Sequence, residues 1–212
     1  MTGLLSVGTM TNALTTAAAG FGTGLSLIVA IGAQNALVLR QGVRREAVLA
    51  VVVICALSDA VLIALGVAGV GAVVVAWPSA LTAVSLLGGV FLIGYGVLAA
   101  RRVFRPAALH AQDAPAGAKR GVVLACLAMT WLNPHVYLDT VFLLGSVAAD
   151  RGPLRWTFGF GAILASVCWF TALGFGARLL RGVLARPSSW RVLDGLVAAM
   201  MIGLGARLAL AA

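Results

Sequence analysis

Charged side chains are scarce in this sequence: they make up 10% of its 212 residues, whereas 62% of the residues are hydrophobic. A soluble domain of this length needs far more polar surface to stay dispersed in water. The scarcity therefore excludes a soluble enzyme, a disordered chain and a disulfide-stapled secreted module. The composition is that of an integral membrane protein.

Acidic residues are the scarcest charged group, six against fifteen Lys and Arg, which gives a net charge of +9. In a soluble protein, such an excess would suggest a nucleic-acid partner. Here the basic residues lie almost entirely between the apolar stretches, as they do in the cytoplasmic loops of membrane proteins. We therefore expect no nucleic-acid partner, and we expect the chain to be surrounded by a lipid bilayer.

The sequence also lacks the usual patterns of metal and cofactor sites. Its three cysteines, Cys55, Cys126 and Cys168, stand alone within apolar stretches, without a C-x-x-C pair. This spacing disfavours a zinc site and a thiol redox transporter, so we interpret the cysteines as small packing residues. No Gly-rich phosphate-binding motif is present either. We expect neither a cofactor nor a resident metal.

Six apolar segments are long enough to cross a bilayer, which takes about 20 helical residues. They are Thr16–Leu39, Ala47–Gly69, Leu81–Ala100, Gly121–Val147, Leu154–Ala177 and Val192–Ala211. The sequence thus predicts an all-α integral membrane protein with six transmembrane helices. We treat residues 1–212 as one transmembrane domain of two three-helix repeats, at about 16–100 and 121–212, joined by a polar cytoplasmic linker at 101–120.

The loops that carry most of the Lys and Arg residues are the first, third and fifth. Because such loops face the cytoplasm, six complete spans place both ends of the chain outside. The two three-helix halves then have opposite orientations, as in an inverted-repeat transporter. If one segment is re-entrant instead, the N-terminus lies on the other side of the membrane.

Two acidic residues lie within predicted spans, where a charged side chain costs about 2.5–3.5 kcal/mol. Asp59 is at the middle of the second segment, and Asp139 lies within the fourth. No Lys or Arg lies at a comparable depth in the neighbouring spans, so we expect both carboxylates to bind a mobile cation or a proton. The alternative is that they are hydrogen-bonded groups that hold helices together. The remaining acidic residues lie in loops or at helix ends and are expected to be solvated: Glu46, Asp113, Asp150 and Asp194.

The fourth segment carries an Asn133-Pro134 pair in its middle. Proline removes a backbone donor and clashes with the preceding turn, and Asn followed by Pro is a favourable start for a new helix. We therefore expect two half-helices, the second beginning near the midplane, with His135, Tyr137 and Asp139 beside the break. Its free amides would attract a substrate carboxylate, while Asp139 holds a positive group. The alternative is a structural proline kink.

Two adjacent amide side chains, Gln34 and Asn35, follow Gly32 and Ala33 in the last turns of the first segment. Such side chains are costly in an apolar run unless they are hydrogen-bonded. We expect them either to line a polar pathway or to bond to a neighbouring helix. Gln34 and Asn35 lie in the first segment of the first half of the chain. The fourth segment, with its Asn-Pro pair, is the first segment of the second half.

Three stretches carry a family resemblance: Gly32–Arg45, Ser58-Asp59 and Thr130–Asp139. They resemble the LysE/ArgO family of bacterial basic amino-acid exporters, and the Asn-Pro-His-Val-Tyr-Leu-Asp string in the third stretch is the most specific. The resemblance covers essentially the whole chain and implies a fold with broken helices near the midplane. It also adds Ser58 to the candidate binding residues. The family commonly has Pro where this chain has Ala33, so a break in the first helix is less expected here than in its relatives.

The resemblance implies export of L-arginine, L-lysine or both across the bacterial cytoplasmic membrane, and we expect this export to be secondary active, by proton antiport. Moving one positive charge outward costs about 2.3 kcal/mol per 100 mV, and an inward proton would supply this energy. Asp59 and Asp139 would face a shared aqueous cavity and alternate between a proton and the cationic substrate. The expected partners are this substrate, protons and the bilayer, and assembly into a homo-oligomer is left open.

Two other functions stay open. An exporter of a divalent metal or another small cation needs a denser set of carboxylate, imidazole or thiol ligands. At membrane depth, the sequence offers Asp59, Asp139, His135 and either Cys55 or Cys126. An intramembrane enzyme is disfavoured, because the sequence has neither a Gly-x-Ser-x-Gly motif with a distant His nor a His-Glu-x-x-His motif.

Overall fold

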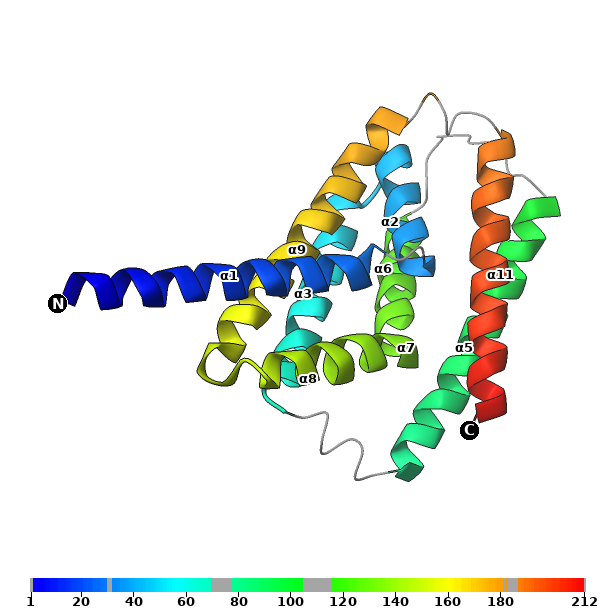
Figure 1. Ribbon diagram of the computed structural model, residues 1–212. Helices are drawn as coiled ribbons and strands as arrows, with labels where there is room; N and C mark the ends of the chain where they lie inside the picture. The colour runs from blue at the N-terminus through cyan, green and yellow to red at the C-terminus, as the bar shows by residue number, and fades with distance from the viewer. Residues whose placement is uncertain are drawn as a thin grey trace. The chain divides into compact units, whose positions relative to one another are not determined.

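The computed structural model describes residues 2–29, 32–69, 78–104, 116–180, 182 and 187–211. Every regular element within these ranges is a helix (Figure 1), which confirms the predicted all-α class. Three described helices are long and apolar enough to cross a membrane: Val48–Val67, Gly152–Leu179 and Ser188–Arg207. Shorter apolar helices cover Arg120–Trp131 and Tyr137–Ala149. These lengths suit a membrane protein, whereas the six-span repeat stays a prediction.

The first predicted segment is not one helix. α1 (Thr2–Ile28) begins well before Thr16, and α2 (Ala33–Arg44) begins only after an interruption. The prediction of a continuous span through Leu39 is wrong because Gly32, a poor helix former, precedes α2 in an extended conformation. The carbonyl of Gly32 accepts the Ala36 N–H at 3.0 Å and so starts the new helix. The segment is therefore broken even without a proline.

A tight corner joins α2 to α3 (Val48–Val67). Arg45 and Ala47 have φ angles of 60° and 48°, both in the left-handed region. The Arg45 N–H donates to the Gln41 carbonyl, which closes the C-terminal end of α2. The corner coincides with the short connection predicted between the first two segments.

The fourth predicted segment is interrupted where the sequence indicated. α6 (Ala116–Trp131) ends shortly before the short helix α7 (Pro134–Val136) begins. This confirms the predicted break at Asn133-Pro134. The proline is the first residue of α7, where its missing N–H leaves no intrahelical hydrogen bond unmade.

The chain then continues as a π-helix, η1 (Tyr137–Leu143), and as α8 (Leu144–Ala149). A π-helix has a wider turn than an α-helix, and it frequently occurs at functional sites. Asp139 lies in the first turn of η1. Nothing in the residue pattern predicted this element.

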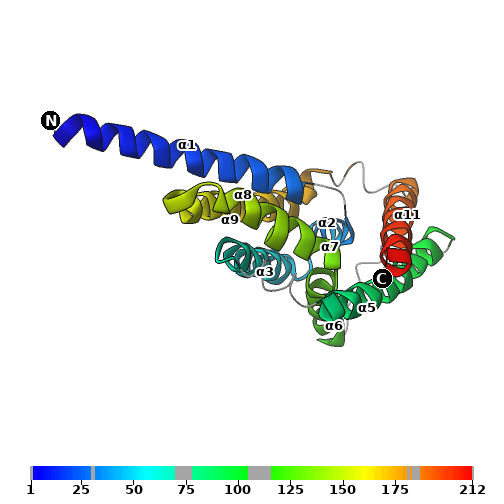
Figure 2. The same ribbon diagram turned by 60° about the horizontal axis from the view of Figure 1, so that its bottom comes forward.

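The remaining long helices contain the other predicted spans. α9 (Arg155–Gly176) lies between the short 3-10 helices η2 (Gly152–Leu154) and η3 (Ala177–Leu180). α5 (Pro78–Phe104) and α11 (Pro187–Ala211) each begin at a proline and lie side by side in Figure 1 and Figure 2. The ends of the predicted linker are helical, and residues 105–115 lie outside the described residues.

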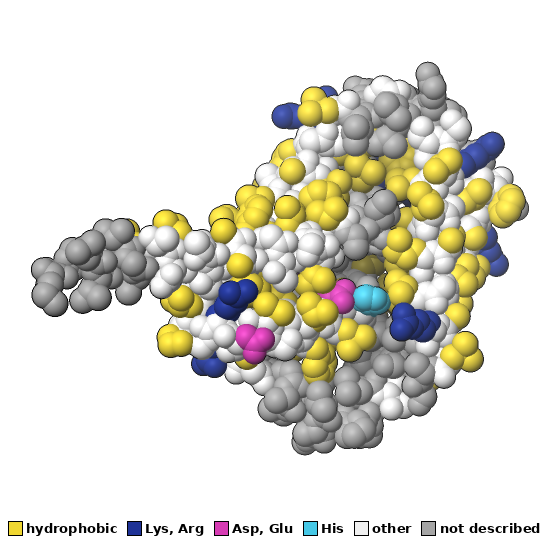
Figure 3. All heavy atoms as spheres, in the orientation of Figure 1, with side chains coloured by type: hydrophobic (Ala, Val, Ile, Leu, Met, Phe, Trp, Pro, Cys, Tyr) yellow, Lys and Arg dark blue, Asp and Glu magenta, His cyan; other side chains and the backbone are white. Residues whose placement is uncertain are grey.

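Helix α3 has the surface of a membrane helix. Val53, Leu57, Val61 and Leu65 recur at four-residue spacing, and all four are exposed. Because this spacing places side chains on one face of a helix, they form an apolar stripe that suits contact with lipid. Figure 3 shows hydrophobic side chains over much of the visible surface.

The chain packs as two compact units, and each takes helices from both halves of the sequence. The first unit comprises Met1–Ala30, Ala56–Ala76 and His135–Trp169. The second comprises Ile31–Cys55, Trp77–Pro134 and Phe170–Ala212. The chain passes from one unit to the other at both helix breaks, between residues 30 and 31 and between residues 134 and 135.

The first unit contains a close approach of α1 to α9. A Cβ atom at Gly20 would overlap the carbonyl oxygen of Phe158, and one at Gly161 would overlap that of Ala17. Without a side chain at these positions, the two helices can pack backbone to backbone, as glycine permits between membrane helices. Phe158 and its neighbour Ala162 belong to the buried apolar core of this unit.

Candidate functional site

Asp59 lies on the protein-facing side of α3 and is only 6% exposed. Its Oδ2 accepts a hydrogen bond of 2.7 Å from the Oγ of Ser166, which is itself fully buried on α9. Among the described residues, no Lys or Arg forms an ion pair with Asp59. The carboxylate is therefore enclosed by protein beside a neutral partner, and its binding of a cation or a proton stays a prediction.

The neighbouring residues of α3 explain this placement. Ser58 is buried next to Asp59, whereas Leu57 and Val61 on the other face are exposed. A helix in lipid turns its apolar side chains outward and its polar side chains toward protein. The position of Asp59 therefore follows from the pattern of α3, but its partner Ser166 could not be identified from that pattern.

Asp139 forms the second polar contact of the first unit. Its Oδ2 lies 2.9 Å from the Nδ1 of His135, one turn earlier, and both side chains are half-exposed. Figure 3 shows a histidine beside an acidic side chain on the visible face. The contact exists because α7 starts at the break and carries His135 into the turn that leads to Asp139. The carboxylate thus has a partner that is charged only when the imidazole is protonated.

The other residues predicted around the break have intermediate exposure. Asn133 precedes α7, and Tyr137 is the first residue of η1. Tyr137 is on the same side of the break in the chain as His135 and Asp139, within the first unit, whereas Asn133 and Pro134 belong to the second unit. The sequence prediction of a polar cluster beside the break is therefore realised by His135 and Asp139, which are in direct contact.

Gln34 and Asn35 do not lie in the last turns of a first span. They lie in the first turn of α2, because α2 begins at Ala33, directly after the extended Gly32. The Nε2 of Gln34 is buried and has no hydrogen-bond partner among the described residues. A buried amide nitrogen is costly unless it is hydrogen-bonded.

The candidate residues are divided between the two units. Ser58, Asp59, His135, Tyr137 and Asp139 belong to the first unit, and the second unit contains Gln34, Asn35, Asn133 and Pro134. Both carboxylates predicted to bind the substrate are therefore in one unit. A shared aqueous cavity between them stays a prediction.

Asp194 was expected to be solvated at a helix end, and this expectation is wrong. Its side chain is 9% exposed and accepts hydrogen bonds from Arg40 Nη2 at 2.6 Å and from Arg102 Nε at 3.3 Å. The error has a physical cause: α11 begins at Pro187 rather than at Val192, so that Asp194 lies about two turns inside the helix. The cluster ties together α2, α5 and α11 within the second unit.

Two aromatic rings support the arginines of this cluster. The guanidinium carbon of Arg40 lies 5.2 Å from the ring centre of Trp190, and that of Arg102 lies 5.3 Å from the ring centre of Tyr95. Such cation–π contacts hold guanidinium groups in place where their hydration is reduced. The proline at the start of α11 is the one feature of the residue pattern that points to this cluster.

Two of the three cysteines, which are far apart in the sequence, meet in the structure. The sulfur atoms of Cys55 and Cys126 lie 3.3 Å apart in the second unit, and both residues are fully buried. Cys168 is exposed on α9. Among the described residues, no three His, Cys, Asp or Glu side chains gather in a way that could hold a metal ion. The cysteine pair therefore lacks the further ligands that a divalent metal prefers.

Apolar helices of membrane-spanning length, two interrupted helices and an enclosed carboxylate together define a multi-pass membrane protein of the translocator class. Residues 25–212 match the family described as LysE type translocator, so the chain belongs to this family. Membership confirms the resemblance found in the sequence and places the chain among translocators rather than enzymes.

Several relatives match over most of their length. One from Mycobacterium tuberculosis (strain ATCC 25618 / H37Rv), named "Putative amino-acid transporter Rv0488", is 53% identical over 84% of this chain and 89% of its own. A lysine exporter LysE from Corynebacterium diphtheriae is 40% identical over 91% of this chain and 97% of its own. An arginine exporter protein ArgO from Serratia proteamaculans is 40% identical over 90% of this chain and 94% of its own. No solved structure is significantly similar to the chain.

Proposed function

We propose that this protein exports a basic amino acid, L-lysine or L-arginine, across the bacterial cytoplasmic membrane in exchange for protons. The observation that carries the proposal is the enclosed carboxylate of Asp59, whose described hydrogen-bond partner is the neutral hydroxyl of Ser166. The names of the relatives from Corynebacterium diphtheriae and Serratia proteamaculans support the choice of substrate.

The electrostatics of Asp59 explain why a cation is needed. A charged carboxylate in the apolar part of a membrane protein is unfavourable unless a positive group or a proton neutralises it. One serine hydroxyl supplies a single hydrogen bond and no charge. Asp59 therefore binds either the positive side chain of the substrate or a proton, and these two states are mutually exclusive.

This exclusion couples the two movements. When a proton from outside neutralises Asp59, the cationic substrate is released to the outside, and loss of the proton to the cytoplasm prepares the site for the next substrate. One proton inward for one cation outward moves no net charge. The membrane potential, which costs about 2.3 kcal/mol per 100 mV for each charge moved against it, therefore does not oppose the exchange. Asp139, with His135 beside it, provides a second position for a positive group.

The second helix break would bind the other end of the amino acid. Backbone amides at the start of a half-helix attract a carboxylate, and the run from α7 to α8 starts at Pro134, next to Asn133. This run would offer donors for a substrate carboxylate, while Asp59 and Asp139 offer acceptors for its positive groups.

Two inverted repeats with six spans would support alternating access to this site. The same number of residues separates Pro78 from Gly96 in α5 and Pro187 from Gly205 in α11. The contacts of the two glycines are reciprocal: a Cβ at Gly96 would lie 2.7 Å from Ile202 Cγ1, and one at Gly205 would lie 2.7 Å from Ile93 Cγ1.

A second correspondence concerns the site itself. Asp59 and Ser166 lie equally far from Val48 and Arg155, the first residues of α3 and α9. In the proposed inverted repeat, the hydrogen bond of the site would join equivalent positions, as expected where a two-fold axis passes between two helices. In this arrangement, the basic first, third and fifth loops face the cytoplasm.

The experiment uses cells that lack their own exporter and are fed arginine- or lysine-containing dipeptides. Cells with the wild-type protein should grow and release the amino acid, whereas cells with the Asp59→Asn variant should accumulate it and stop growing. Asp150→Asn, which changes an exposed acidic residue, is the matched control and should behave as the wild type. Normal export by Asp59→Asn would refute the proposal, and the dipeptide that stalls growth identifies the substrate.

A further inference from the structure

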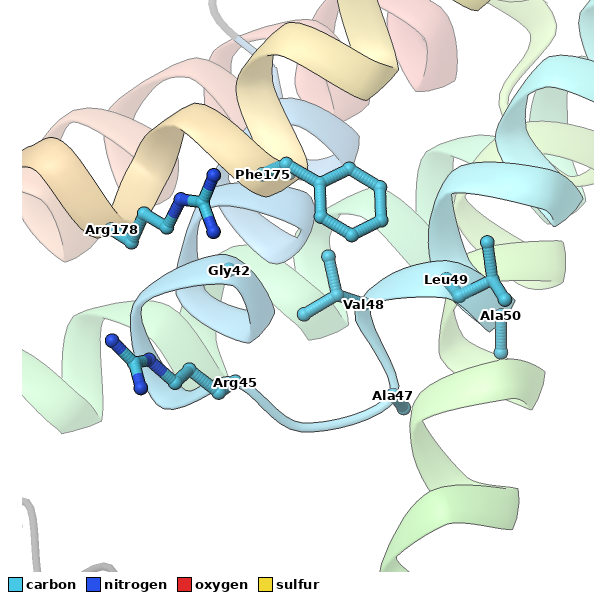
Figure 4. Close-up of a pocket in the computed structure, with 9 residues that line it drawn as sticks. Gly42, Arg45, Ala47, Val48, Leu49, Ala50, Phe175 and Arg178 are labelled. Atoms are coloured by element: carbon cyan, nitrogen blue, oxygen red, sulfur yellow. The ribbon is translucent and has the colours of Figure 1, made fainter.

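A second candidate site lies at the corner between α2 and α3, next to the C-terminal end of α9. It is an open pocket of about 490 Å³ within the second unit (Figure 4). The residues that matter for its chemistry are two arginines and four apolar residues: Arg45, Arg178, Val48, Leu49, Ala50 and Phe175. None of them belongs to the candidate transport site described above.

The apolar part of the pocket is formed where two long apolar helices end. In Figure 4, Val48 and Phe175 face each other across the middle of the pocket, and Leu49 and Ala50 lie toward one end. Leu49 is 66% exposed, and Phe175 is exposed on α9. Since α3 and α9 are of membrane-spanning length, this surface lies where a helix leaves the hydrocarbon layer, and acyl chains can cover it.

The charged part of the pocket is at the opposite end. Arg45 and Arg178 both lie on that side in Figure 4, and both are exposed. Among the residues that the structure describes, no Asp or Glu lines the pocket, and neither guanidinium forms an ion pair. This differs from Arg40 and Arg102, whose charges are shared with Asp194. The pocket therefore presents two positive charges that no described acidic side chain pairs with.

The backbone at Arg45 has a defined conformation that places this residue at the corner. Arg45 has the left-handed φ of 60°, and its N–H is bonded to the Gln41 carbonyl. Gly42, which directly follows Gln41 in α2, has no room for a side chain because a Cβ there would overlap Gly174 of α9. The close approach of α2 to α9 therefore holds the basic corner beside the end of α9, where η3 carries Arg178.

We propose that this pocket binds one anionic phospholipid of the cytoplasmic leaflet. The phosphate would lie between Arg45 and Arg178, because guanidinium groups bind phosphate oxygens through paired, charge-assisted hydrogen bonds. The upper part of an acyl chain would lie over Val48 and Phe175. Basic pockets beside apolar helices on the cytoplasmic side bind anionic headgroups in this way, and both arginines belong to loops that the charge pattern places on that side.

The same charges argue against a substrate in this pocket. A lysine or arginine side chain would be repelled by two guanidinium groups that form no ion pair with a described acidic residue. A free phosphate ion would satisfy the arginines but would leave the apolar surface of Leu49 and Phe175 uncovered. The lipid uses both parts of the pocket, and its binding does not depend on the role of Asp59.

The test measures thermal unfolding of the purified, delipidated protein in detergent while lipid is added. Phosphatidylglycerol should raise the unfolding temperature of the wild type more than phosphatidylcholine with the same acyl chains. The double variant R45Q/R178Q should lose this preference, with binding of phosphatidylglycerol about thirtyfold weaker, from the contribution of two basic residues to anionic-lipid binding. R44Q/R101Q removes the same charge from two exposed arginines that do not line the pocket and should keep the preference.

Two further measurements keep the outcomes distinct. Native mass spectrometry counts bound phosphatidylglycerol and does not depend on how the variant unfolds, and R45K/R178K should retain most of the binding that R45Q/R178Q loses. Inorganic phosphate at the same concentration should not raise the unfolding temperature. The proposal is overturned if R45Q/R178Q and R44Q/R101Q bind the lipid equally, if phosphatidylcholine binds as well, or if phosphate alone reproduces the effect.

Discussion

Asp194→Asn removes a buried carboxylate that accepts hydrogen bonds from two arginines on two other helices. The variant keeps the shape of the side chain but leaves the guanidinium groups of Arg40 and Arg102 without a counter-charge. Breaking a fully buried ion pair in this way costs about 3–5 kcal/mol. The Arg40 and Arg102 side chains are 21% and 34% exposed, so water replaces part of the lost interaction, and we expect a loss of about 2–3 kcal/mol.

The two arginines should contribute unequally. Arg40 has the shorter contact, 2.6 Å, and the lower exposure, and it also lies over Trp190. Arg102 contacts Asp194 at 3.3 Å and is more exposed. We expect Arg40→Gln to cost about 1–2 kcal/mol and Arg102→Gln less than about 1 kcal/mol. Because both act through one carboxylate, the double variant R40Q/D194N should be only slightly less stable than D194N alone.

The assay is thermal unfolding of the purified protein in one detergent. For a chain of this length, a loss of about 2–3 kcal/mol lowers Tm by about 5–10 °C. Asp150→Asn, at an exposed position, should leave Tm within about 2 °C of the wild type. The reasoning would be refuted if Asp194→Asn and Asp150→Asn had the same Tm, or if Arg102→Gln were more damaging than Arg40→Gln.

Three other predictions concern packing, the site and the cysteines. Gly20→Ala should lower the free energy of unfolding by about 1–3 kcal/mol because its Cβ would overlap a backbone carbonyl of α9. The control Gly22→Ala, with open space around its Cβ, should leave Tm unchanged or slightly raised. Equal Tm values for the two variants would contradict the packing of α1. Ser166→Ala should weaken substrate binding by about tenfold, as expected for a lost hydrogen bond to a charged group. Ser166→Thr, which keeps a hydroxyl, should restore the binding. The concentration dependence of arginine and lysine transport in proteoliposomes measures the affinity of both variants. N-ethylmaleimide should label Cys168 in the folded protein, and the two buried cysteines only after unfolding. Mass spectrometry measures the labelling, and equal labelling of all three cysteines in the folded protein would contradict the burial of Cys55 and Cys126.

The two helix breaks differ in how far the sequence could predict them. The break before Pro134 was located correctly because proline cannot continue a helix and makes a favourable first residue for the next one. The break before α2 is not predicted from the residues because hydropathy remains high through it, and Gly32 alone is a weak signal. The error moved Gln34 and Asn35 from the end of one helix to the start of another. The π-helix that carries Asp139 has no residue signature at all.

In the candidate site, the position of a single residue could be predicted from the sequence, whereas its partner in space could not. The position of Asp59 could be predicted because a carboxylate in the middle of an apolar segment is rare and costly. Its partner Ser166 could not, because serine is tolerated in many membrane helices, and the two residues are 107 positions apart. Asp194 was misjudged because hydropathy placed the start of the last helix at Val192, although Pro187 was a usable start signal.

The most direct test of the central claim is proton movement coupled to substrate movement at Asp59. Purified protein is placed in liposomes that contain a pH-sensitive dye, and a gradient of arginine or lysine is imposed. With the wild type, we predict that protons move opposite to the amino acid and that collapse of the pH gradient slows transport. With Asp59→Asn, both movements should cease. Amino-acid transport by Asp59→Asn at the wild-type rate, with unchanged proton movement, would contradict the account.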